Sequence, residues 1–237
     1  MRLRHAAFAL ALAPLIACEA VDSEDVFTSG MYADLAVTNS GSNTRAAAIL
    51  RVGGGTSNTF VELTGDDSLT LNIGEESTAL QSQNFGDIWS YNTDLELGDV
   101  GTEYSFALER SVDEGAPSST CTMPAPFELS APEMDASVSR SEDSLLISWD
   151  GSNEADPMEL ILDSECTELL VLPVDQDTGS YTLPAGEITP YEGMEDDSCK
   201  GSLVLRRVRA GALDTGYGEG GQVHAAQERS VDLQFAP

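Results

Sequence analysis

The sequence has few basic residues, few aromatic residues and almost no histidine. Its 237 residues include 11 Lys and Arg against 41 Asp and Glu, which gives a formal net charge of -30. Binding to nucleic acid and electrostatic docking on anionic lipid both require clustered cations. The composition therefore excludes nucleic acid as a partner and disfavours contact with anionic head groups. Apolar residues at 41% and aromatic residues at 6% are typical of a globular chain with few large core residues.

Motifs for catalysis and tight metal binding are also scarce. The two histidines are His5 and His224, whereas a His-based zinc site needs two or three imidazoles. No nucleophile-elbow motif accompanies His224, which we predict to be an exposed strand residue. The triplet Gly53-Gly54-Gly55 lacks the Gly-Lys-Ser/Thr that completes a phosphate loop, and no Cys-x-x-Cys spacing occurs. We therefore expect no enzymatic activity and no obligatory cofactor.

The N-terminus has the pattern of a secretory signal. Arg2 and Arg4 form a short basic start, and an apolar run follows over residues 6–13. The apolar stretch to residue 18 is shorter than the roughly 20 residues that a helix needs to span a bilayer. It therefore predicts export of the chain, with removal of the signal.

The end of this segment reads Leu15-Ile16-Ala17-Cys18 and resembles the lipobox of bacterial lipoproteins. The resemblance implies cleavage before Cys18 and attachment of lipid to its thiol, so that the chain contacts the membrane through its N-terminal lipid. By resemblance to the enterobacterial sorting rule, Glu19 in the next position implies the outer membrane. Cleavage removes two arginines and no acid, which leaves a formal charge of −32. We predict a signal peptide over residues 1–17 and an acidic tether over residues 18–25.

The remainder of the chain has the pattern of an all-β protein. Short β-branched or alternating stretches recur between Gly, Asn and Asp turns, and sustained helical periodicity is absent. We expect strands over residues 31–38, 45–52, 59–64, 69–73, 88–94 and 103–109. The closely spaced prolines between residues 123 and 132 mark a break. We therefore predict two tandem antiparallel β-sandwich domains, over residues 26–125 and 126–237.

The second half carries a loose family resemblance. Residues 144–149, which end in Trp149, are similar to the second strand of a fibronectin type III or immunoglobulin-like sandwich, and residues 179–184 to a later strand. Residues 202–209 and 222–235 resemble its final hairpin. The endings at residues 122–127 and 235–237 indicate that the first half is a diverged copy. The whole chain resembles the two-domain envelope lipoproteins of myxobacteria.

With Cys18 lipidated, three cysteines remain for an oxidising compartment. Cys166 and Cys199 belong to the same predicted domain and both lie in acidic, turn-like contexts, so we predict a disulfide between them. Closing that loop stabilises the fold by about 4 kcal/mol on a chain-entropy estimate. Cys121 is then a free thiol, which is either buried as a small apolar residue, as we expect, or available to a partner molecule.

Two weaker patterns concern ligands. Trp89 and Tyr91 alternate on one strand face, where they form either a stacking platform for a sugar or part of the core. Asp175 and Asp177 lie in an acidic loop that is a candidate Ca²⁺ site, although a salt-adapted acidic surface explains such loops equally. Similar acidic loops occur at residues 66–67, 163–165 and 195–197. Arg206, Arg207 and Arg209, with Lys200, form a basic stripe that either receives an anionic partner or, as we expect, pairs with neighbouring acids.

These observations predict a lipid-anchored protein of the outer membrane. Its sandwiches would act as a non-enzymatic binding, adhesion or scaffolding module for a protein or polysaccharide partner, because such domains present function on their loops and edges. One alternative is a carbohydrate-binding accessory module that uses Trp89 and Tyr91, with or without Ca²⁺. A carboxylate-based envelope hydrolase is a third.

Overall fold

The computed structural model describes residues 19–86, 88–96, 98–151, 155–174 and 177–237. These residues form eighteen β-strands, two short 3-10 helices and no α-helix, which confirms the predicted all-β class. No helix in the described ranges has the length and hydropathy needed to cross a membrane.

Eleven strands form one long sheet. Its main path runs in the order β1-β4-β3-β2-β18-β17-β14-β15, while β8 also pairs with β3, β7 with β8, and β12 with β18. The bounds are β1 (Glu19–Asp22), β2 (Met31–Asn39), β3 (Thr44–Val52), β4 (Thr59–Glu62), β7 (Gln81–Phe85), β8 (Ile88–Leu95), β12 (Ala136–Ser139), β14 (Met158–Ser164), β15 (Leu170–Val174), β17 (Cys199–Ala210) and β18 (Gln222–Ala236).

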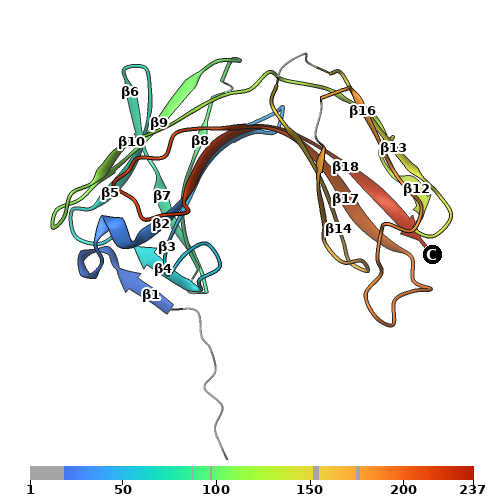
Figure 1. The fold of residues 1–237 in the computed structure, drawn as a ribbon, viewed down its shortest axis with the longest axis horizontal. Helices are drawn as coiled ribbons and strands as arrows, with labels where there is room; N and C mark the ends of the chain where they lie inside the picture. Colours follow the sequence, from blue (N-terminus) through green and yellow to red (C-terminus); the bar gives the residue numbers. More distant parts are fainter. Residues whose placement is uncertain (1–18, 87, 97, 152–154, 175–176) are drawn as a thin grey trace, which may run out of the picture.

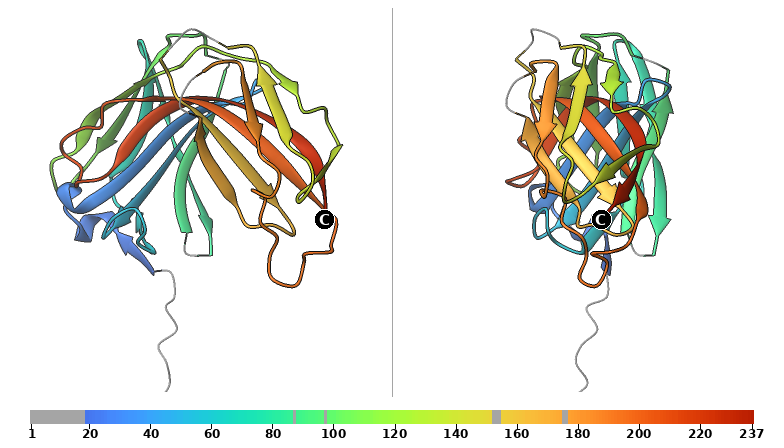
Figure 2. Two further views of the ribbon diagram at one scale, coloured as in Figure 1. Left: turned by 45° about the vertical axis from the view of Figure 1, so that its right-hand side comes forward. Right: turned by 90° about the vertical axis from the view of Figure 1, so that its right-hand side faces the viewer.

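Two smaller sheets complete the molecule. The first cover sheet has the order β10-β9-β5-β6 and the second cover sheet has the order β11-β13-β16. Their strands are β5 (Ser68–Ile73), β6 (Glu76–Ala79), β9 (Glu103–Glu109), β10 (Ala116–Thr122), β11 (Leu129–Ala131), β13 (Leu145–Trp149) and β16 (Ser180–Leu183). Figures 1 and 2 show the long sheet as an arch, with the cover sheets on its outer side.

The two long strands β17 and β18 form the crown of the arch. They pair antiparallel at twelve positions, from Cys199 opposite Phe235 to Ala210 opposite His224. The first part of β18 also pairs in parallel with β2, and its last part pairs in parallel with β12. One strand therefore belongs to both halves of the molecule (Figure 2).

The hydrophobic residues divide into two cores. The first lies between the long sheet and the first cover sheet, and the second lies between the long sheet and the second cover sheet. The predicted pair of sandwiches is thus present. However, Tyr217, Val223 and Ala225 from the C-terminal segment belong to the first core, whereas Val231 and Leu233 belong to the second. The domain boundary at residues 125/126 stays a prediction. No single boundary in the sequence separates the two cores, because residues after this point contribute to both of them.

The tether predicted over residues 18–25 is wrong from Glu19 onward. Residues 19–22 form β1, which pairs in parallel with β4, and a 3-10 helix (Ser23–Asp25) follows. Ser23 is fully buried, where its hydroxyl donates to Asp67 at 2.7 Å. The Arg110 guanidinium donates to the Ser23 carbonyl at 2.6 Å and pairs with Asp67. The buried Arg110 guanidinium needs hydrogen-bond acceptors and therefore orders residues 19–25. From composition alone, this segment is expected to be a flexible acidic tether.

A second buried arginine fixes the link between the sandwiches. Arg207 on β17 is completely buried and forms an ion pair with Asp177 at 2.7 Å. It also donates to the carbonyls of Ala125 and Pro126, at 2.6 and 2.9 Å, and lies 5.1 Å from the centre of the Phe127 ring. The proline-rich link is therefore held against the crown of the arch by charge-assisted hydrogen bonds.

We expect Arg207→Met to lower the free energy of unfolding by about 3–5 kcal/mol, because it removes the cation that pairs with the buried carboxylate of Asp177. The matched control is Arg206→Met at the preceding position of β17, where a partly exposed side chain pairs with Glu228 at 2.7 Å. That change is expected to cost less than about 1 kcal/mol. Urea unfolding measures both values, and equal losses would contradict the role of Arg207.

Candidate functional site

The long sheet borders a hollow of about 700 Å³. Strands β2, β3, β14, β15, β17 and β18 contribute its lining, together with residues that flank β14, β17 and β18. The hollow thus spans both halves of the chain and depends on the long sheet that joins them.

Strand alternation determines which side chains line the hollow. On β2, Ala33, Leu35 and Val37 are buried in the first core, while Asp34, Ala36 and Thr38 line the hollow. On β17, Leu205 and Arg207 are buried, and Arg206 and Val208 line it. The concave face is therefore the face of the long sheet that neither cover sheet occupies.

The floor of the hollow has small side chains around a single imidazole. The registers place Ala210 opposite His224, His224 opposite Ala36, and Ala36 opposite Ala47, so four residues on four strands form one row. Methyl groups on either side leave room around the His224 ring. His224 is a strand residue as predicted, but the prediction that it is exposed is wrong, since the curvature of the sheet leaves it only partly accessible.

Charged groups stand at the margins of this floor. Asp34 accepts a hydrogen bond from Gln222 at 3.0 Å, and Arg206 lies between Glu228 at 2.7 Å and Glu159 at 3.8 Å. Burial lowers the pKa of His224 below its ordinary value of 6.5, an effect that Arg206 reinforces and Asp34 and Glu159 oppose. The hollow consequently offers a neutral imidazole at pH 7, which both donates and accepts hydrogen bonds.

The expected pairing of the three arginines is confirmed. Arg206 pairs with Glu228 and Arg207 with Asp177, and Arg209 binds both oxygens of Asp156 at 2.6 and 2.9 Å. The three arginines of β17 are therefore neutralised by acids of their own fold.

The stacking platform of Trp89 and Tyr91 is not present. Tyr91 is only 2% exposed; its hydroxyl donates to the Val61 carbonyl at 2.9 Å and accepts from the Leu63 amide at 2.7 Å. Burial raises the pKa of Tyr91 to about 12. Trp89 is half-buried. Tyr91 thus belongs to the core, where it joins β8 to β4.

Asp177, one of the two candidate calcium ligands, is engaged in an ion pair with Arg207. The Asp177 side chain is 1% exposed, pairs with Arg207 and accepts the indole N–H of Trp149 at 2.6 Å. Asp175 lies outside the described residues. Within those residues, no three His, Cys, Asp or Glu side chains are grouped closely enough to hold a metal. Asp177 is therefore assigned to the Arg207 pair rather than to a cation.

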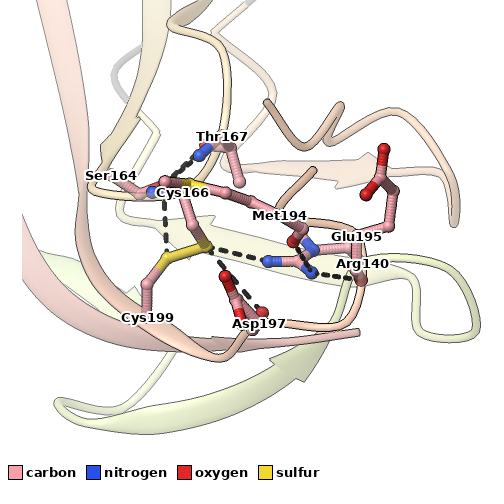
Figure 3. The surroundings of a disulfide bond; sticks show 8 residues. All are labelled: Arg140, Ser164, Cys166, Thr167, Met194, Glu195, Asp197 and Cys199. Atoms are coloured by element: carbon pink, nitrogen blue, oxygen red, sulfur yellow. Dashed lines mark hydrogen bonds between the residues drawn. A yellow bond between two sulfur atoms is a disulfide. The ribbon is translucent and has the colours of Figure 1, made fainter. Parts of the chain in front are cut away.

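The predicted disulfide between Cys166 and Cys199 is confirmed. It joins the turn after β14 to the start of β17 (Figure 3). Arg140 lies beside it, with one N–H 2.9 Å from the Cys166 sulfur and others donated to the carbonyls of Met194 and Glu195. The bond and the arginine together hold the long loop before β17.

Cys121 is free and buried, as expected. Burial raises the pKa of its thiol to about 12, and Glu103 adds to the effect. The thiol is therefore protonated and unreactive at neutral pH. Cys18 and the other lipobox residues Leu15, Ile16 and Ala17 lie outside the described residues, so the lipidation site stays a prediction.

The concave face was not found from the sequence. Its residues come from segments up to about 190 positions apart, and only the pairing of β18 with β2 brings them together. The one available signal was the presence of small alanine residues in the predicted strands, such as Ala36 and Ala47. Small residues on one face of a strand indicate a surface that other atoms approach closely.

No protein-family model matches the chain, and no curated protein matches it. Several solved structures of tandem domains are similar to it. The FN1–FN3 domains of chicken CNTN1 show 11% identity and a TM-score of 0.31, with 90% of this chain and 67% of that chain covered. A two-domain fibronectin type III segment of chicken tenascin shows 13% identity and a TM-score of 0.24, with 86% and 98% covered.

A third similar structure is SGBP-B of the Bacteroides ovatus mixed-linkage glucan utilization locus, solved with a mixed-linkage heptasaccharide. It shows 12% identity and a TM-score of 0.19, with 97% of this chain and 69% of that chain covered.

Replacing both Cys166 and Cys199 with Ala is expected to lower the free energy of unfolding by about 4 kcal/mol, because the bond closes a loop with a sequence separation of 33. Urea unfolding with and without reductant measures it. Reductant should destabilise the native chain and leave the double variant unchanged. Equal stability of the two chains under oxidising conditions would contradict the estimate.

The only histidine of the chain after residue 17 is His224, so its imidazole resonance can be followed without overlap. We expect an NMR titration midpoint below pH 6.5. Between that midpoint and pH 6.5 the unfolded state binds more protons than the native state, so this contribution to stability is complete above pH 6.5 and is lost as the pH falls. His224→Gln should therefore lose less stability than the native chain between pH 7 and pH 5. A midpoint above 6.5 would overturn the assignment.

Proposed function

We propose that this chain is a lipid-anchored protein of the bacterial outer membrane and a non-enzymatic binding module. Its anchor is the lipid on Cys18, and its binding surface is the concave face of the long sheet. The partner is a protein or polysaccharide of the envelope. The observation that carries the proposal is the open hollow of about 700 Å³ that crosses from one sandwich to the other.

The character of the lining supports binding rather than packing. Strands on both sides of the β17–β18 pair contribute small side chains, one imidazole and polar groups to the lining. These groups lie on the face of the long sheet that neither cover sheet occupies. A sheet face built for burial carries large apolar residues, as the opposite faces of β2 and β17 do with Leu35, Leu203 and Leu205. Binding pockets characteristically combine apolar surface with a few placed polar groups.

Rigidity gives this surface a further advantage as a binding site. The hollow lies on long, mutually paired strands rather than on loops, and the buried Arg207 fixes the link behind it. A preformed surface loses little conformational entropy when a partner binds.

The proposed binding of a partner in the hollow is tested in cells by placing a photo-crosslinking amino acid at position 36. The matched control is position 146, because Leu146 is 52% exposed and alternates with core residues of the second cover sheet, so that its side chain points outward. We expect a discrete adduct from position 36 and none from position 146. Equal labelling at both positions, or none at either, would contradict a partner on the concave face.

A polysaccharide partner is distinguished by the His224 resonance. If the hollow binds polysaccharide, addition of purified envelope polysaccharide to the protein should shift the chemical shift of the His224 imidazole. Ala36→Trp, which fills the floor beside His224, should abolish the shift.

The anchor is tested separately by Cys18→Ala. We expect the native chain to fractionate with the outer membrane and to incorporate labelled fatty acid, and the variant to do neither, because the thiol is the acceptor of the lipid. Incorporation of label into the variant would exclude Cys18 as the site.

A further inference from the structure

The two sulfurs of the Cys166–Cys199 bond have different surroundings. Cys166 lies in the turn after β14 and is only 2% exposed. Cys199 is the first residue of β17, is only partly buried, and follows the exposed residues 191–198. The rate of thiol–disulfide exchange depends on access to the sulfur that is attacked. A thiol from solution therefore reaches the Cys199 side of the bond more readily than the Cys166 side.

The buried side of the bond lies against a positive charge. Arg140 is 3% exposed, and one of its N–H groups is 2.9 Å from the Cys166 sulfur (Figure 3). Its other contacts are with neutral acceptors, the carbonyls of Met194 and Glu195, at 3.2 and 2.8 Å. Among the described residues, no carboxylate forms an ion pair with this guanidinium. Such a buried cation stabilises negative charge that develops on the sulfur beside it.

The acids near the bond are placed differently from Arg140. Figure 3 shows the Glu195 carboxylate turned away from both sulfurs, and it accepts a backbone amide at 3.1 Å. Asp197 presents its carbonyl oxygen, 4.0 Å from the Cys166 sulfur. Glu165 and Glu168 flank this cysteine in the turn and are both exposed. The guanidinium is thus the charged group in contact with the buried sulfur.

These differences give the exchange reaction a direction. A thiolate attacks one sulfur of a disulfide, and the other sulfur leaves as a thiolate, more easily when that thiolate is stabilised. On the Cys166 side the guanidinium supplies this stabilisation. The Cys199 sulfur lies instead 3.6 Å from the neutral hydroxyl of Ser164. Access and leaving-group stability therefore favour the same outcome, with attack on Cys199 and departure of Cys166.

We propose that the Cys166–Cys199 bond is a thiol-exchange site with this fixed direction. The incoming thiolate forms a bond to the Cys199 sulfur, and the electron pair of the old bond stays on Cys166 as a thiolate beside Arg140. A monothiol remains attached to Cys199. A dithiol completes the reduction, because its second thiolate attacks its own first sulfur and Cys199 leaves, taking a proton from solvent. The dithiol is thereby oxidised to a disulfide as the protein bond is reduced.

The charge around Cys199 selects the class of thiol. Four exposed acids lie in the seven residues before it, at positions 192, 195, 196 and 197, and one cation, Lys200, follows it. A local excess of negative charge raises the concentration of cations and lowers that of anions. We therefore assign the site to thiols that carry an amine rather than a carboxylate.

The first test maps the direction of exchange on the native bond. The full chain with Cys18→Ala retains Cys121 as its free thiol, which is buried. This chain is exposed briefly to cysteamine at pH 7, quenched with acid, unfolded and alkylated, and the adducts are located by mass spectrometry. We expect cysteamine on Cys199 and the alkyl group on Cys166, at least about tenfold over the reverse. Equal amounts, or an excess of cysteamine on Cys166, would overturn the proposal.

The class of thiol is tested with cysteamine and mercaptopropionate at low ionic strength. Rates are expressed per thiolate and divided by the rates with a small neutral disulfide. Cysteamine should then be faster at least about threefold, and the difference should shrink at about 1 M salt. Equal normalised rates would overturn the assignment to aminothiols.

The role of Arg140 is tested by Arg140→Gln in the same chain. We expect exchange to slow at least about threefold, because the leaving thiolate loses its cation. The matched control is Arg206→Gln, which removes a partly exposed arginine of β17 and should leave the rate unchanged. An unchanged rate for folded Arg140→Gln would contradict the proposal.

A further measurement keeps Arg140 in place. In the chain with Cys18→Ala and Cys199→Ser, the ultraviolet absorbance of thiolate reports on Cys166. Cys121 does not contribute below about pH 9, since burial raises its pKa to about 12. We expect the midpoint of thiolate formation below about 8.5, the value of an ordinary cysteine. A midpoint at or above that value would show that the guanidinium does not stabilise the leaving group, and the proposal would fail.

Discussion

The pairing of β17 with β18 along twelve positions is the interaction on which the rest of the structure depends. Strand β18 is longer than either sandwich requires, and it contributes residues to both cores. Because successive strands of a sheet twist relative to one another, so long a ladder curves, and the curvature turns one sheet into an arch. Arg207 secures the same region from the other side, where it binds the carbonyls of the proline-rich link and the carboxylate of Asp177. Without this shared ladder the two cores would be independent domains on a flexible connection.

The arch explains where a partner is expected to bind. Its outer face is occupied by the two cover sheets, which bury the large apolar residues of both cores. Its inner face retains Ala36, Ala47, Ala210 and His224 in one row across four strands. Small side chains there let a partner approach the backbone closely, and the neutral imidazole provides direction through hydrogen bonds.

Much of the strand pattern was predictable from local sequence. The strands at residues 31–38, 45–52 and 103–109 were predicted within one residue of β2, β3 and β9, because short apolar or alternating stretches lie there between Gly, Asn and Asp turns. Strands β14 and β15 were not predicted, since acidic residues and a proline obscure their alternation. The run at residues 19–25 was predicted to be a tether because seven largely acidic residues show no core pattern. Its order comes from Arg110, which lies more than 80 positions away.

The sequence by itself determined the all-β class, the disulfide between Cys166 and Cys199, the burial of Cys121, and the pairing of the arginines on β17 with acids. These follow from periodicity, from the number of cysteines and from the excess of carboxylates, all of which are local or compositional. Only the tertiary structure decided that the sandwiches share a sheet, that Tyr91 and Asp177 serve the fold rather than a ligand, and that His224 stands in a concave hollow. Those outcomes depend on which distant strands pair, and the pairing of β18 with β2 is fixed by burial of Val223 and Ala225 in a core made by residues nearly 200 positions away.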